Sequence, residues 1–140
     1  MKQQVLLDTG PLVASLSRAD HHHEWVSMQW RDIEPPLLTC ESVISEAGFL
    51  LARVPGAKQA VFELLRRQII TVPFRLSDHA SFLAALLNKY SGVPMSVAGA
   101  CLVRMAEQFH ESAVLTVDSD FRLYRKHGRQ VIPLIIPATI

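Results

Sequence analysis

The chain has 140 residues, of which 49% are hydrophobic, and a formal net charge of +1. This length and apolar content predict a single domain, residues 1–140, with a substantial core. The charge does not indicate a strongly basic nucleic-acid binder, although basic residues can still gather locally. No apolar run approaches the roughly 18 residues of a membrane span, and the N-terminus lacks a basic-then-apolar signal segment. Cys40 and Cys101 have no metal-ligand spacing, and we expect both to be reduced thiols in a cytoplasmic protein. Without a membrane span or signal segment, we expect no membrane contact.

The first half of the chain alternates short apolar runs with amphipathic segments. Strands are predicted at Val5–Leu7, Leu37–Thr39 and Ile69–Val72. Helices are predicted between them at Pro11–Ser17, Asp20–Arg31, Glu41–Arg53 and Ala57–Arg67. The helix from Glu41 shows the clearest periodicity, because Val43, Ala47 and Leu50 fall on one face.

The second half continues the alternation. Helices are predicted at Ser77–Tyr90, with Ser77 as N-cap, at Met95–Phe109, and at Ser119–Lys126. The middle helix is apolar on most sides and is expected to be central. Strands are predicted at Val114–Val117 and Val131–Leu134, and Pro133 favours an edge position for the last one. Strands separated by helices indicate an α/β fold with a mainly parallel sheet covered on both faces.

Two of these strands end in an acid. Asp8 follows the first strand, and Asp118 follows Val114–Val117. In a parallel sheet, ligands bind outside the carboxyl ends of the strands, so the two carboxylates can meet there. Clustered carboxylates repel one another unless a proton or a hard cation intervenes. The pattern therefore indicates a candidate metal site.

Each acid also has a plainer explanation. Glu46 borders the apolar stripe of its helix and is either a solvated rim residue or one directed at a cation. Asp118 could cap the following helix, and Asp120 could favour its dipole. Asp8 before Thr9 and Gly10 could belong to a turn. These alternatives stay open at the level of single residues.

Taken together, the ordered motifs resemble a known family. The resemblance rests on Asp8-Thr9-Gly10-Pro11-Leu12, on Glu46, on Pro94-Met95, and on Leu115-Thr116-Val117-Asp118-Ser119-Asp120-Phe121. In order and spacing the chain is similar to PIN-domain proteins, and in particular to the VapC-like toxin ribonucleases.

The resemblance implies a three-layer α/β/α sandwich and a Mg²⁺- or Mn²⁺-dependent ribonuclease that cleaves RNA. Its metal-site residues would be Asp8, Glu46 and Asp118, with Asp120 as a fourth candidate. Thr9 and Thr116 match hydroxyl positions near such a site. It further implies a small antitoxin as partner and a homodimer.

One position departs from the family pattern. Gly99 stands where the resemblance leads us to expect an aspartate in the helix after Pro94-Met95. The site would therefore be one negative charge short, and two-metal binding is in question. The main alternative is a catalytically impaired PIN domain that binds RNA or a partner protein. A DNA nuclease of the flap and 5′-exonuclease group is a third interpretation, which the short chain disfavours.

Two further features bear on partners. The basic residues Arg122 and Arg125 follow Asp118 closely, with Lys126 and Arg129 beyond them, and could contact RNA phosphates; a solvated face is the alternative. The Asp20–Arg67 part carries Trp25, Trp30 and Phe49, more apolar surface than a small domain is expected to bury. We therefore predict a homodimer and a docking site for a partner helix there.

Overall fold

The computed structural model describes residues 3–140 and is built around a five-stranded sheet with the order β3-β2-β1-β4-β7, in which every neighbouring pair is parallel. Its strands are β1 Gln4–Leu7, β2 Leu37–Leu38, β3 Ile70–Thr71, β4 Ser112–Leu115 and β7 Leu134–Ile135. The helices are α1 Thr9–Leu16, α2 His23–Asp32, α3 Glu41–Leu50, α4 Ala57–Arg66, α5 Ala80–Lys89 and α6 Val97–Gln108. Two 3₁₀ helices, η1 Leu76–His79 and η2 Ser119–Arg122, and an antiparallel ribbon, β5 Arg125–Lys126 with β6 Gln130–Val131, complete it.

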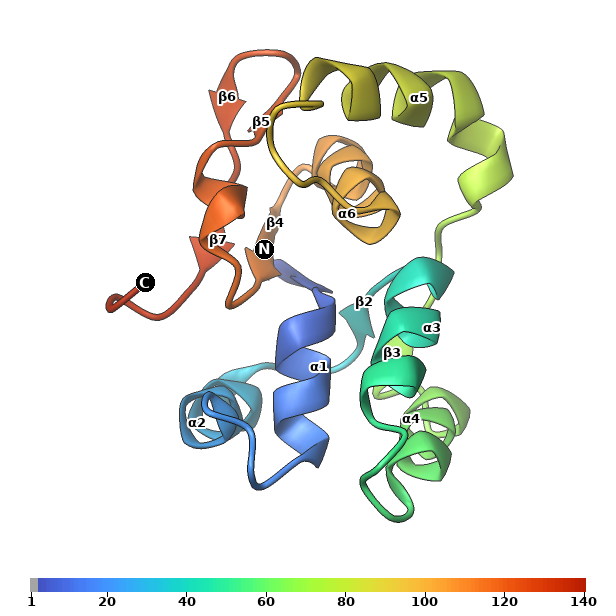
Figure 1. Ribbon diagram of the computed structural model, residues 1–140, viewed down its shortest axis with the longest axis vertical. Coiled ribbons are helices and arrows are strands. Elements are labelled where there is room, and N and C mark those ends of the chain that lie inside the picture. The colour runs from blue at the N-terminus through green and yellow to red at the C-terminus, as the bar shows by residue number, and fades with distance from the viewer. Residues whose placement is uncertain (1–2) are drawn as a thin grey trace.

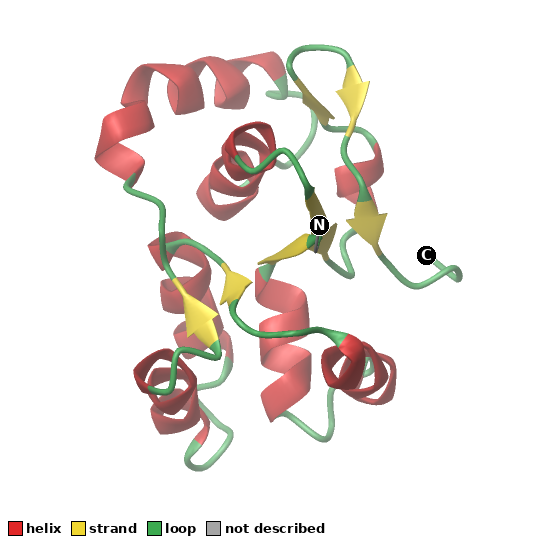
Figure 2. Cartoon of the chain, turned by 180° about the vertical axis from the view of Figure 1, so that it is seen from behind, coloured by secondary structure: helices red, strands yellow, loops and turns green. Residues whose placement is uncertain are grey.

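The strand order places a topological switch point between β1 and β4. The chain steps outward from β1 to β2 and β3, and then returns across the sheet to β4. Because crossovers between parallel strands are right-handed, the outward and returning connections put their helices on opposite faces. Figures 1 and 2 show α5 and α6 on one side of the central strands and α1 and α2 on the other. Ligands of such sheets bind where the order reverses, outside the carboxyl ends of the two strands.

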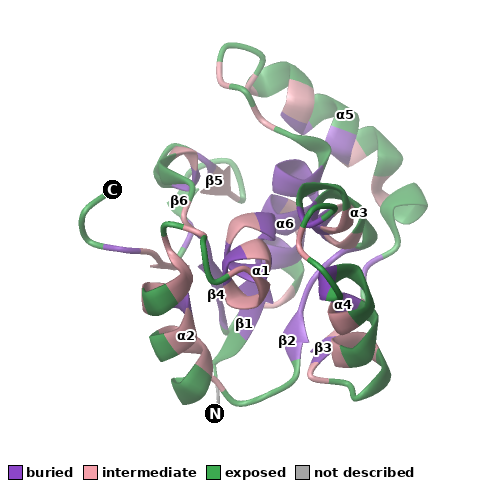
Figure 3. Ribbon diagram, turned by 60° about the horizontal axis from the view of Figure 1, so that its bottom comes forward, coloured by how far each residue is buried: buried purple, intermediate pink, exposed green. Residues whose placement is uncertain are grey.

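The core lies around β1, β2, β4 and α6. Leu6 and Leu7 are fully buried, and so are most of the residues from Ala98 to Glu107 on α6 (Figure 3). An all-round buried helix needs apolar residues on every side, which the sequence of α6 supplies. This confirms the predicted central position of the helix and fixes its first turn beside the switch point.

The predicted fold class is confirmed: a mainly parallel sheet lies between helical layers. Most predicted elements also exist, with shifted ends. The second helix begins at His23 rather than Asp20, because the Asp20 side chain accepts a hydrogen bond from the His22 N–H at 2.8 Å and forms a turn. Ser77 was wrongly predicted as an N-cap, since it lies inside η1 and α5 begins only after His79.

The C-terminal part differs most from the prediction. The helix predicted over Ser119–Lys126 is wrong beyond Arg122, because Arg125 and Lys126 form a strand that pairs with Gln130 and Val131. The last predicted strand is divided at Pro133, which has no N–H to donate. Its second part, β7, is an edge strand, as the proline indicated. None of the helices in the described part of the chain is long and apolar enough to cross a membrane.

Candidate active site

Asp8 occupies the carboxyl end of β1 and is only 8% exposed. Its Oδ1 accepts a hydrogen bond from the Thr9 N–H at 2.8 Å, and its Oδ2 accepts one from the Thr116 hydroxyl at 2.7 Å. Burial raises the pKa of this carboxyl to about 6, although both hydrogen bonds lower it. The nearby charges of Asp118 and Glu46 raise it further. Asp8 is therefore a buried acid surrounded by other acids.

The end of β4 approaches Asp8 through a chain of hydrogen bonds. Thr116, which donates to Asp8, accepts a hydrogen bond from the Asp118 N–H at 2.9 Å. The Asp118 Oδ1 in turn accepts the Asp120 N–H at 2.9 Å and caps η2. The capping role predicted for Asp118 is thus confirmed. It employs one carboxylate oxygen, and the side chain remains exposed.

A close approach between α1 and the loop after β4 keeps these two ends together. A Cβ atom at Gly10 would lie 2.5 Å from Cγ2 of Val117, far inside van der Waals contact. A glycine is therefore required in the first turn of α1. The Thr9-Gly10 pair does not form the turn considered from the sequence, because the helix already begins at Thr9.

Asp8, Glu46 and Asp118 line one pocket of about 250 Å³, which we call the acid pocket. Glu46 reaches it from α3, where Val43 and Ala47 are buried and the glutamate is exposed. The other lining residues are Thr9, Gly10, Leu50, Pro94, Ser96, Gly99, Val117, Phe121 and Tyr124. The pocket opens at the switch point of the sheet, where the topology places a ligand.

The remaining predicted site residues do not line this pocket. Asp120 is half-buried in η2 beside it, and Thr116 lies beneath it. The Arg122 guanidinium donates to the carbonyl of Ile140 at 3.1 Å, and Arg125 donates to the carbonyls of Arg122 and Tyr124 at 2.7 and 3.0 Å. Both arginines are thus engaged with the backbone close to η2.

The pocket offers the donor set of a hard cation. Its carboxylates carry no cationic partner, and the buried Thr9 hydroxyl has no hydrogen-bond partner within the described chain. Oxygen ligands of this kind suit Mg²⁺, which keeps several of its waters and needs few direct protein ligands. In their present conformations, no three His, Cys, Asp or Glu side chains of residues 3–140 are close enough to surround one ion together. The three acids face one pocket without converging on one point.

Two polar lining residues were not predicted. Ser96 caps α6, and its hydroxyl accepts the Gly99 N–H at 2.9 Å. A serine before an apolar helical run is a recognisable N-cap signal, which a helix start at Met95 obscured. Tyr124 is 2% exposed, and burial, followed by the charges of Asp118, Asp120 and Asp8, raises its pKa to about 12. Nothing local in the sequence singles this tyrosine out.

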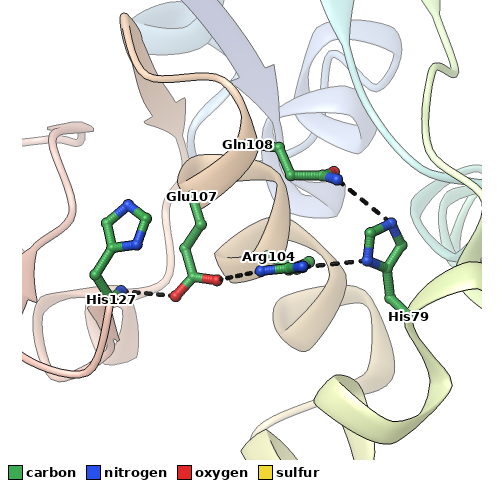
Figure 4. A network of polar contacts seen from close by, with 5 residues as sticks. All are labelled: His79, Arg104, Glu107, Gln108 and His127. Atoms are coloured by element: carbon green, nitrogen blue, oxygen red, sulfur yellow. Dashed lines mark hydrogen bonds and ion pairs between the residues drawn. The ribbon is translucent and has the colours of Figure 1, made fainter.

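A second buried acid lies in the last turn of α6, whereas Gly99 of the first turn lines the acid pocket. Glu107 is 7% exposed and pairs with Arg104 at 3.0 Å, while its Oε2 accepts the His127 N–H at 2.6 Å. The Arg104 Nε donates a hydrogen bond to the His79 ring at 3.1 Å. The same ring lies close to the side chain of Gln108 (Figure 4). This network joins η1, α6 and the loop of the β5–β6 ribbon.

Comparison with known proteins gives three findings. The family model described as "PIN domain" matches residues 5–127. No curated protein matches the chain. Among solved structures, that of VapC20 from Mycobacterium tuberculosis, a Sarcin-Ricin loop cleaving toxin, superimposes with a TM-score of 0.75. That match has 18% sequence identity and covers 84% of this chain and 92% of VapC20. The family match spans most of the sequence, including both strand-ending acids, and the chain belongs to the PIN domain family.

Proposed function

We propose that this protein is a metal-dependent endoribonuclease, the VapC-like toxin of a toxin–antitoxin pair. The observation that carries the proposal is the state of Asp8. It is buried, its pKa is raised to about 6, and it faces Glu46 and Asp118 in one pocket without a protein cation. A protein tolerates such a cluster poorly unless a bound cation relieves the repulsion. The structurally similar VapC20 is a toxin that cleaves the Sarcin-Ricin loop, an RNA target, which supports RNA as the substrate here.

We assign Asp8, Glu46 and Asp118 as the residues that would hold Mg²⁺ or Mn²⁺. Asp120 would support them by fixing Asp118 through its backbone N–H. When bound, such an ion supplies an activated water and offsets the charge that develops on the phosphate. The Thr116 hydroxyl orients Asp8, and the free Thr9 hydroxyl is available to a ligand.

RNA would reach the pocket along the basic residues at the end of η2 and just after it. The guanidinium groups of Arg122 and Arg125 are fixed by hydrogen bonds to backbone carbonyls. Contacts from such arginines to phosphates carry no sequence information, so they position the strand rather than select it. The free, buried thiols of Cys40 and Cys101 are consistent with action in the cytoplasm.

A cleavage assay tests the proposal. Purified protein is incubated with mixed RNA and Mg²⁺ or Mn²⁺, and the wild type is compared with Asp8→Asn. The matched control is Asp78→Asn, which removes an exposed carboxylate of η1 outside the pocket. We expect the wild type and the control to cut RNA and Asp8→Asn to lose cleavage. Equal cutting by the wild type and Asp8→Asn would refute the assignment of the site.

A catalytically impaired binding module is the second candidate, and Gly99 favours it. This wall of the pocket has no fourth carboxylate, and the acids do not converge. If the wild type binds RNA but neither ion supports cutting, the binding module is the better description. Protection of RNA from a second nuclease would show that binding directly.

For association, we propose that the exposed apolar residues of α3 and α4 form the interface. Phe49 is 80% exposed, Leu50 55% and Phe62 64%, whereas Trp25 and Trp30 are half-buried and pack against the core. Leu50 also lines the acid pocket, so an antitoxin helix covering it would lie beside the acids. Light scattering of the wild type and Phe49→Ser should show a homodimer that the substitution weakens. A monomeric wild type at high concentration would contradict the dimer.

A further inference from the structure

Tyr124 is held rigidly at the edge of the acid pocket. Its ring packs edge-on against Phe121 and against Tyr90, with centroid distances of 5.1 Å in both cases. The side chain is 2% exposed, and yet it is one of the residues that line the pocket of Asp8 and Asp118. The aromatic cluster therefore fixes the ring while one part of it faces the site.

The hydroxyl of Tyr124 makes no hydrogen bond to any described residue. The neighbouring Tyr90 differs, because its hydroxyl accepts the Arg125 N–H at 3.0 Å. Among the buried side-chain nitrogen and oxygen atoms of the described residues, only Thr9 Oγ1 lacks a partner, so the Tyr124 oxygen keeps contact with solvent. Its hydroxyl is therefore a free donor, in a pocket lined mostly by carboxylates, for a ligand that accepts hydrogen bonds.

Gly99 lies beside this ring, in the first turn of α6. A Cβ atom at Gly99 would lie 4.0 Å from Cε2 of Tyr124 and 3.4 Å from the Ser96 hydroxyl. A side chain added at Gly99 would therefore be in ordinary van der Waals contact with the ring. Gly99 and the Tyr124 ring therefore belong to the same wall of the pocket.

We propose that Tyr124 is a further catalytic residue, whose hydroxyl donates a hydrogen bond to a nonbridging oxygen of the RNA phosphate in the pocket. The inference rests on the proposed function and names a new contact to the same substrate. The carboxylates of Asp8, Glu46 and Asp118 repel a phosphate, so a neutral hydrogen-bond donor in the same pocket would favour its binding. A phenol, with an ordinary pKa near 10, stays protonated at neutral pH and meets that need.

The test compares Tyr124→Phe with Tyr90→Phe. Both remove one hydroxyl from the same aromatic cluster, and only Tyr124 is a residue that lines the pocket. Single-turnover cleavage with Mg²⁺ is expected to fall about 10-fold or more in Tyr124→Phe, the effect of a lost hydrogen bond to a charged acceptor. Tyr90→Phe should melt earlier and retain the rate. Mg²⁺ affinity, measured by calorimetry, should be the same in the wild type and Tyr124→Phe.

A metal-free measurement separates this inference from the proposed function. The affinity for an RNA oligonucleotide in EDTA is compared between Asp8→Asn and Asp8→Asn with Tyr124→Phe. We expect the second protein to bind about 2- to 10-fold more weakly. If the wild type does not cut RNA, the proposed function fails, while weaker binding by the double variant still supports the contact. Unchanged RNA affinity would overturn the inference, and so would a loss of Mg²⁺ affinity in Tyr124→Phe, which would assign the phenol to the metal.

Discussion

The two buried acids, Asp8 after β1 and Glu107 near the end of α6, are in opposite electrostatic situations. Glu107 is neutralised by Arg104 and also accepts the His127 N–H. Asp8 accepts hydrogen bonds from Thr9 and Thr116, and the charged groups that affect its pKa are two other acids. Both carboxylates are buried to a similar degree, so burial alone does not distinguish them.

The comparison separates a buried charge that is neutralised within the protein from one that is not. A buried acid with a paired cation and satisfied hydrogen bonds has its charge neutralised by the protein itself and needs no ligand. A buried acid among other acids costs folding free energy that only a bound cation or a proton can recover. Substitutions at the two sites should therefore have opposite effects on stability.

The largest effect is expected at Glu107. Glu107→Ala leaves Arg104 without its ion pair and the His127 N–H without its acceptor, and should lower the free energy of unfolding by about 3 kcal/mol. Chemical denaturation measures this. The control is Glu63→Ala, which breaks the Glu63–Arg66 pair of the same i,i+3 spacing on the surface and should change little. A similar loss in both variants would mean that the Glu107 network adds nothing beyond a surface pair.

The next effect is the pH dependence of Asp8. Its pKa is about 6 in the folded protein and has the ordinary value of 3.8 in the unfolded chain, so only the folded state binds a proton between these values. The stability of the metal-free protein should therefore fall as pH rises from about 4 to 6, by up to about 3 kcal/mol from this group. Asp8→Asn removes this contribution, and above pH 6 it should unfold at higher denaturant concentration than the wild type.

Unfolding of both proteins at several pH values isolates the contribution of Asp8, because other titrating groups are common to both. Added Mg²⁺ should stabilise the wild type above pH 6 and have little effect on Asp8→Asn. A difference between the two proteins that does not change with pH would show that Asp8 has an ordinary pKa and that its burial costs nothing.

Much of this arrangement follows from local patterns. Asp8 and Asp118 were predicted to meet because apolar strands precede them and parallel strands align their carboxyl ends. The central α6 was predicted because its apolar residues surround the helix. The signal for each strand and for the helix lies in residues adjacent in sequence, and parallel pairing of β1 with β4 then brings the two strand ends together.

Other features depend on contacts between distant segments. Arg125 and Lys126 continue a helical pattern, but pairing with Gln130 and Val131 makes them a strand. Tyr124 lines the site while its ring packs on Tyr90 and Phe121, and Glu107 accepts a hydrogen bond from His127 in the loop of the β5–β6 ribbon. Such tertiary contacts override local propensity and leave no short-range signal.

A third prediction concerns Gly99, which lines the acid pocket without a side chain. Gly99→Asp adds a carboxylate beside Asp8 and Asp118, and the nearest side-chain atom to a Cβ placed there is 3.4 Å away, so the backbone accommodates it. Mg²⁺ affinity measured by calorimetry should rise about 10-fold, equivalent to about 1.4 kcal/mol, since another oxygen ligand and charge favour the cation.

Gly99→Ala is the matched control. It should melt slightly later than the wild type, because glycine weakens a helix, and it should bind Mg²⁺ unchanged. RNA cleavage at limiting Mg²⁺ should increase in Gly99→Asp and disappear when Asp118→Asn is added. A lower melting temperature in both Gly99 variants with unchanged Mg²⁺ affinity would show that the glycine serves packing.

The smallest effect is expected at Thr116, whose hydroxyl is the side-chain donor to Asp8. Thr116→Val keeps the shape of the side chain but removes the hydrogen bond to Asp8 and the acceptor of the Asp118 N–H. The pKa of Asp8 should rise further, by the amount that corresponds to losing a hydrogen bond of about 1 kcal/mol. Because a proton and Mg²⁺ compete for this carboxylate, the pH at which Mg²⁺ affinity is half-maximal should increase by the same amount.

Thr116→Ser is the control, because it retains the hydroxyl and should behave like the wild type. An unshifted pH profile in Thr116→Val would mean that burial and the neighbouring acids alone control Asp8, and that Thr116 only anchors the loop that carries Asp118.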